Sequence, residues 1–88
     1  MLENKRIIVT GAARGMGEAT VIAYVSAGAQ VVAMDINDEN GAAVVAEANK
    51  AGPGQATYQH IDIADKDSVF AAFDQAAKHL GGLDALDH

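Results

Sequence analysis

Three glycines in residues 10–17 have a spacing that is suited to holding a phosphate group. Gly11 permits a sharp turn, Gly15 has no Cβ to keep a ligand away from the backbone, and Gly17 permits close helix packing. The free N–H groups and the dipole at the start of the following helix favour an anion. The alternative is a glycine-rich strand-to-helix turn without a ligand. No Gly-Lys-Ser/Thr follows, so the segment is not a P-loop.

The elements that would position this turn follow from hydrophobic patterning. Apolar, β-branched runs predict strands at residues 6–10 and 30–35, and a more mixed run predicts a strand at 56–61, near a sheet edge. Helical spacing predicts helices at 16–27, from a cap at Asn37 or Asp38 to about residue 51, and from a cap at Asp65 to residue 80. Residues 83–86 begin a fourth strand. This alternation predicts an α/β fold with a parallel sheet.

The predicted helices should each bury one stripe of residues. The stripes are Met16, Ala19, Ile22, Ala23 and Ala27 in the first helix, Ala42, Val45, Ala46 and Asn49 in the second, and Val69, Phe73, Ala76 and Leu80 in the third.

Composition limits the function classes. The chain has 88 residues, which allow one domain, and its net charge is −6. Without a basic face it is not expected to bind nucleic acid or an anionic membrane. It has no cysteine and no ligand spacing among its three histidines, so we expect no metal site. The absence of a signal-peptide core or a membrane span in the sequence favours a cytoplasmic protein.

The pattern Thr-Gly-x-x-x-Gly-x-Gly at residues 10–17 resembles the cofactor fingerprint of the short-chain dehydrogenases/reductases. Residues 28–32, the pair Asp62-Ile63 and residues 81–86 are similar to further segments of that family, so the resemblance covers the whole chain. It implies a Rossmann-type three-layer fold with strand order 3-2-1-4 and helices on both faces of the sheet. It also implies that residues 1–88 are the N-terminal part of a larger domain, ending within the fourth strand, where Asp87 and His88 depart from the family pattern.

The bound molecule implied by the resemblance is a nicotinamide dinucleotide. Asp35 ends the second strand 18 residues after Gly17, where its carboxylate can accept hydrogen bonds from the adenosine ribose. A 2′-phosphate there would meet like charge, so we expect NAD rather than NADP. The alternative for Asp35 is a solvated acid at a strand end. Arg14 resembles the NADP-preferring pattern, but it can instead pair with another phosphate or with Asp35.

The other expected contacts lie in the same three segments. The resemblance places Met16 under the nicotinamide end and the pair Asp62-Ile63 at the adenine, and Ile36 is also expected to contact the cofactor. Asp62 has the alternative of an acid at a helix entry, acting together with Asp65. The cofactor-binding set is therefore Gly11, Arg14, Gly15, Met16, Gly17, Asp35, Ile36, Asp62 and Ile63.

The family's catalytic serine and Tyr-x-x-x-Lys pair have no counterpart in this sequence. The residue four places after Tyr24 is Gly28, and four places after Tyr58 it is Asp62. We therefore expect a cofactor-binding segment of an oxidoreductase that is inactive alone. The alternatives are a nucleotide-binding or interaction module without catalysis, and a truncation product without a role of its own. Exposed sheet edges or helix faces are expected to promote self-association.

Overall fold

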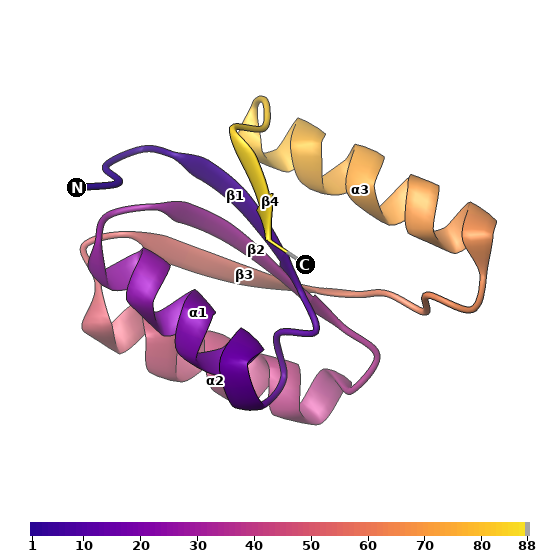
Figure 1. The fold of residues 1–88 in the computed structure, drawn as a ribbon, viewed down its shortest axis with the longest axis horizontal. Coiled ribbons are helices and arrows are strands. Elements are labelled where there is room, and N and C mark those ends of the chain that lie inside the picture. The colour runs from indigo at the N-terminus through magenta and orange to yellow at the C-terminus, as the bar shows by residue number, and fades with distance from the viewer. Residues whose placement is uncertain (88) are drawn as a thin grey trace.

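The computed structural model describes residues 1–87 and contains four strands that alternate with three helices (Figure 1). The strands are β1 (Arg6–Thr10), β2 (Gln30–Asp35), β3 (Gln55–His60) and β4 (Ala85–Asp87). The helices are α1 (Gly15–Ser26), α2 (Asp38–Ala51) and α3 (Lys66–Leu80). The expected fold class is confirmed. His88, where we expected the family pattern to break, lies outside the described residues.

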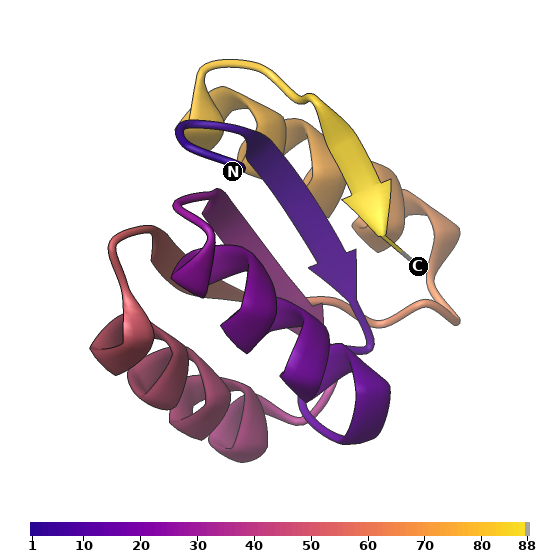
Figure 2. The ribbon, with the colours of Figure 1, turned by 60° about the vertical axis from the view of Figure 1, so that its left-hand side comes forward.

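The strands form one parallel sheet in the predicted order β3-β2-β1-β4. Ile8 of β1 is level with Val32 of β2 on one side and with Leu86 of β4 on the other. Figure 2 shows β1 and β4 running in the same direction. Because all four strands are parallel, their carboxyl ends meet at one edge, where ligands of open α/β sheets bind.

Helices cover both faces of the sheet, so the molecule has three layers (Figure 1). One buried cluster joins α1 and α2 to the sheet, mainly through valines such as Val21, Val25 and Val44. A second cluster joins α3 to the other face through Ile8, Met34, Ile61 and two alanines of α3. The central strands β1 and β2 are buried on both faces, as their continuous apolar runs predicted.

The helix ends follow the capping residues in the sequence. Asn37, and not Asp38, caps α2, because its side chain accepts a hydrogen bond from the Asn40 N–H. Asp65 caps α3 by accepting from the Ser68 N–H, as predicted. Gly81 ends α3 in the left-handed conformation.

Two of the predicted helix stripes are wrong in part: Ile22 of α1 and Val45 of α2 pack against the first cluster as predicted, but most of their companions do not. In α1 the buried residues are Val21 and Val25, and Met16, Ala19 and Ala23 are exposed. In α2 the buried residues are Gly41, Val44 and Ala48, whereas Ala42 and Ala46 are exposed. Both helices carry alanine on several faces, and the bulkier valines gain more from burial, so they determine the rotation. The stripe predicted for α3 packs on the second cluster as expected.

Candidate functional site

A pocket of about 260 Å³ lies where β1, β2 and β3 end. Five of the predicted site residues line it: Gly11, Asp35, Ile36, Asp62 and Ile63. Thr10 and Ile61 complete the lining and were not predicted as site residues. They could have been found from their places, because Thr10 is the last residue of β1 and Ile61 directly follows β3.

The glycine-rich turn connects β1 to α1 beside this pocket. Gly11 and Gly15 have φ values of +64° and +61°, a conformation that L side chains rarely adopt. Gly17 packs directly on the backbone of Gly11, and a Cβ on it would overlap the Gly11 carbonyl. The turn therefore needs glycine at all three positions, at two for backbone conformation and at one for close packing.

The start of α1 is open to an anion. Arg14 is the N-cap residue, but its side chain makes no capping hydrogen bond. The first N–H groups of a helix have no carbonyl partner within the helix. A Cβ built on Gly15 meets no atom within 4 Å, so the backbone there is accessible to a phosphate.

Asp35 connects the glycine-rich turn to the loop after β2. One carboxylate oxygen accepts a hydrogen bond from the Ala13 N–H at 3.1 Å, and the other accepts from the Asn37 N–H at 2.9 Å. Each oxygen keeps a lone pair for a further donor. The side chain is therefore fixed by two loops at the edge of the pocket, with the capacity to accept from ligand hydroxyls.

Asp62 has a local role as well as a place in the pocket lining. Its Oδ1 accepts from the Ala64 N–H at 3.0 Å, and its carbonyl oxygen accepts from the Asp65 N–H. This arrangement agrees with the alternative of an acid at a helix entry. Asp62 also lines the pocket.

The pocket lining combines the Asp35 and Asp62 carboxylates with apolar side chains. Ile36 and Ile63 are 60% and 73% exposed, which is unusual for large aliphatic side chains. Both line the pocket. Aliphatic side chains beside hydrogen-bond acceptors suit a ligand that has both an apolar surface and polar groups.

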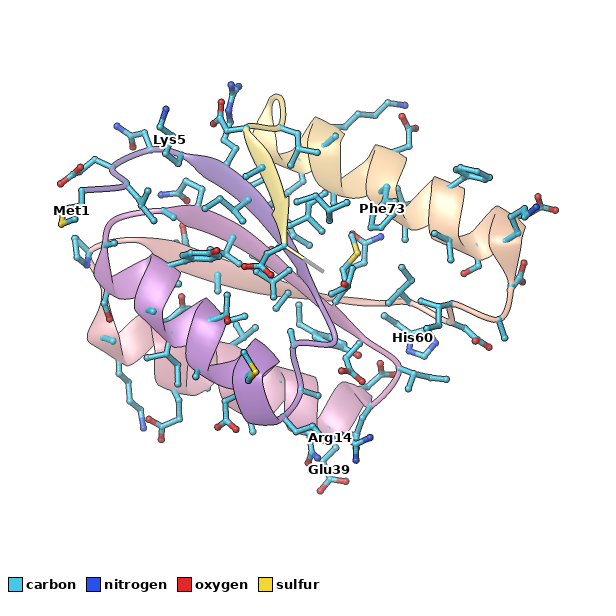
Figure 3. All side chains as sticks on the ribbon, in the orientation of Figure 1. Met1, Lys5, Arg14, Glu39, His60 and Phe73 are labelled. Carbon is cyan, nitrogen blue, oxygen red and sulfur yellow. The ribbon has the colours of Figure 1, made fainter. Side chains whose placement is uncertain are left out.

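Arg14 and Met16 do not line this pocket. Arg14 borders a separate hollow between the starts of α1 and α2, with Glu18 and Glu47. It forms no ion pair with Asp35 or any other acid within residues 1–87. Met16 is 87% exposed at the first turn of α1. Figure 3 places Arg14 and His60 toward the end of the sheet where the strands finish, away from Met1 and Lys5.

The hydroxyls of both tyrosines are held by carboxylates. Tyr24 donates to Asp87 and Tyr58 to Asp38, each at 2.6 Å. The hydrogen bond to Asp87 raises the pKa of Tyr24. Asp87, whose carboxylate was unexpected in β4, thus has a hydrogen-bond partner in α1. Across residues 1–87 there is no group of three or more side chains suited to a metal ion, and no helix is long and apolar enough to cross a membrane.

The short chain dehydrogenase family model matches residues 5–88. The chain belongs to the short-chain dehydrogenase family. Members of this family bind a nicotinamide cofactor, NAD or NADP.

Similar proteins are dehydrogenases of about three times this length. A 2,5-dichloro-2,5-cyclohexadiene-1,4-diol dehydrogenase of Sphingobium indicum is 48% identical over 83 residues, which are 94% of this chain and 32% of that protein. A 3-alpha-(or 20-beta)-hydroxysteroid dehydrogenase of Mycobacterium bovis is 45% identical over 97% of this chain and 31% of its own length.

The solved structure of a hydroxysteroid dehydrogenase from Escherichia coli superposes with a TM-score of 0.90 and 39% identity. The match covers 97% of this chain and 34% of that one. The 88 residues therefore span about a third of the length of the short-chain dehydrogenases that they match.

Proposed function

We propose that this chain binds NAD(H) and is the cofactor-binding segment of a short-chain oxidoreductase. The adenosine would occupy the pocket at the ends of β1, β2 and β3, and the pyrophosphate would lie at the start of α1. The observation that carries the proposal is the position of Asp35, whose carboxylate joins the glycine-rich turn to the loop after β2 at the edge of the pocket.

The preference for NAD over NADP follows from the charge of Asp35. A 2′-phosphate beside this carboxylate would be repelled by about 1 kcal/mol at 4 Å in water, and by about 4 kcal/mol at an effective dielectric constant of 20. Arg14 is exposed and borders a different hollow, and within residues 1–87 Asp35 forms no ion pair that would offset its charge. A tenfold preference for NAD corresponds to about 1.4 kcal/mol, which lies within this range, so we expect a preference of about tenfold.

In the complete enzyme, the nicotinamide would exchange a hydride with an alcohol or carbonyl substrate, as the family relationship implies. This segment would contribute affinity and orientation to that reaction and no catalytic residue. Neither tyrosine is followed by a lysine four residues later. We propose that the 88-residue chain does not reduce NAD⁺ by itself.

Calorimetric titration with NAD⁺ and NADP⁺ tests the proposal. We expect saturable binding of both, with NAD⁺ binding more tightly. Asp35→Asn should reduce the ratio of the two affinities, because it removes the negative charge and keeps one acceptor oxygen. Asp67→Asn, a change in the exposed first turn of α3, is the matched control and should leave the ratio unchanged. Tighter binding of NADP⁺ by the unsubstituted chain would refute the expected preference.

A further inference from the structure

A cluster of hydrogen-bonded side chains lies on the side of the Asp35 loop away from the glycine-rich turn. Asp38, the first residue of α2, is its centre. Its Oδ1 accepts from the Tyr58 hydroxyl at 2.6 Å and lies 2.7 Å from Nδ1 of His60. Tyr58 and His60 both come from β3, so this cluster connects an edge strand to the start of α2. We call Asp38, Tyr58 and His60 the α2 anchor.

The Tyr58 hydroxyl also contacts the end of β2. It lies 2.6 Å from the carbonyl oxygen of Asp35, which accepts the Ile61 N–H as well. One hydroxyl thus lies between the last residue of β2 and the first residue of α2. The loop between them, Ile36 and Asn37, is therefore held at both of its ends.

The Tyr58 ring occupies a place that the sequence leaves open for it. Gly41 lies within α2, and a Cβ there would overlap the ring. Glycine inside a helix is less stable than alanine, so its presence at residue 41 needs a packing reason. Without a side chain at residue 41, the ring can lie against the first turns of α2 with its hydroxyl at Asp38.

The charge states of the α2 anchor agree with this hydrogen bonding. The Tyr58 hydroxyl, and after it the His60 ring, lower the pKa of Asp38. Burial, followed by the hydrogen bond to Asp38, raises the pKa of Tyr58. Asp38 is therefore a carboxylate and Tyr58 a neutral donor across the ordinary pH range.

We propose that Tyr58 and His60, acting through Asp38, are positioning residues for the adenosine site. They hold the end of β2, which carries Asp35, and the loop of Ile36 and Asn37, and so keep the Asp35 carboxylate between the Ala13 and Asn37 N–H groups. This inference rests on the proposed function, since its value to the protein is tighter cofactor binding.

The two tyrosines provide a matched pair of variants. Tyr58→Phe removes the hydroxyl and keeps the ring against Gly41. Tyr24→Phe removes a hydroxyl that also donates to a carboxylate at 2.6 Å, but to Asp87 in β4 and away from the loop. In calorimetric titrations with NAD⁺, Tyr58→Phe should weaken binding about three- to tenfold. Tyr24→Phe should leave the affinity within about twofold. Equal affinities of the two variants for NAD⁺ would overturn the proposal.

His60 is tested by loss and rescue. His60→Ala removes the donor to Asp38 and should weaken NAD⁺ binding by about two- to fivefold. His60→Asn restores an N–H donor close to the position of Nδ1 and should recover the affinity. If His60→Asn binds NAD⁺ as weakly as His60→Ala, the imidazole does not act through its bond to Asp38.

A measurement without ligand separates this inference from the proposed function. Amide hydrogen exchange of Asn37 and Ala13 reports the two hydrogen bonds to Asp35. Tyr58→Phe should accelerate exchange at Asn37, whereas Tyr24→Phe should not. If the unsubstituted chain fails to bind NAD⁺, the proposed function fails, and the exchange rates alone then decide the positioning role. Unchanged exchange at Asn37 in Tyr58→Phe would overturn it.

Discussion

The two glycines at the start of α1 should respond differently to alanine, because they are required for different reasons. Gly17 packs on backbone, and the atoms that a Cβ would overlap are the carbonyl of Gly11 and the Cα of Ala12. Backbone atoms cannot rotate away, so Gly17→Ala must push α1 from the turn. Gly15 has open space around it and a φ of +61°. Gly15→Ala therefore costs conformational strain alone.

The expected magnitudes follow from these two causes. Overpacking at Gly17 should destabilise the fold by about 2 kcal/mol. A left-handed alanine at residue 15 should cost about 1 kcal/mol. In a domain of this size, 1 kcal/mol lowers Tm by about 4–8 °C. Gly17→Ala should thus lose about 8–16 °C, and Gly15→Ala about half as much.

NAD⁺ binding should fall strongly in both variants. The two variants should differ in how much stability they lose along with the affinity. Gly15→Ala places a methyl group where the pyrophosphate is proposed to lie. It should therefore lose about tenfold or more in NAD⁺ affinity, with a smaller loss of Tm than Gly17→Ala. Thermal unfolding followed by circular dichroism, together with calorimetry, measures both quantities. A Tm for Gly17→Ala equal to that of the unsubstituted chain would refute the packing argument. Unchanged NAD⁺ affinity in Gly15→Ala would refute the pyrophosphate site.

Three further predictions concern the sheet edge and the charged residues. The hydrogen bond from Arg6 lowers the pKa of Asp84 from 3.8 to about 2, so the stability that the Asp84 carboxylate contributes is present above pH 3.8 and is lost as the pH falls toward 2. Urea unfolding at several pH values should show that Asp84→Asn is less stable than the unsubstituted chain near neutral pH, and that the difference disappears in acid; a constant difference would contradict this. Arg14→Ala should weaken NAD⁺ binding by about two- to fivefold if its charge faces a phosphate, and unchanged affinity in calorimetry would exclude that role. Because β4 is an edge strand with Ala85 and Leu86 exposed, we propose that the chain self-associates, so light scattering should give a mass above 9.0 kDa, whereas a monomer at all concentrations would count against it.

The fold could be predicted from the sequence where local signals were strong. β1 and β2 were predicted to the residue, because continuous apolar runs end at Gly11 and at Asp35. The rotation of α1 was not predicted, because alanines on several faces make the apolar pattern almost uniform around the helix. Only packing against the sheet distinguishes Val21 and Val25 from Ala19 and Ala23.

The candidate site was predicted in part for similar reasons. Glycine spacing and a strand-end acid are visible in sequence, and Gly11 and Asp35 do line the pocket. The hydrogen bond from Ala13 to Asp35 depends on how two loops meet in space, and no local pattern encodes it. The same is true of Tyr58 and Asp38, which are 20 residues apart in sequence and are joined by the pairing of β3 with β2.

The central claim is that the ends of β1, β2 and β3 form one adenosine site. Its most direct test is an NMR titration of the isotope-labelled chain with NAD⁺, following backbone amide signals. We predict saturable shifts at Gly11, Gly15, Ile36 and Ile63, and none at Lys5, at the opposite end of the sheet (Figure 3). Shifts that avoid these loops, or no shifts at any NAD⁺ concentration, would contradict the claim.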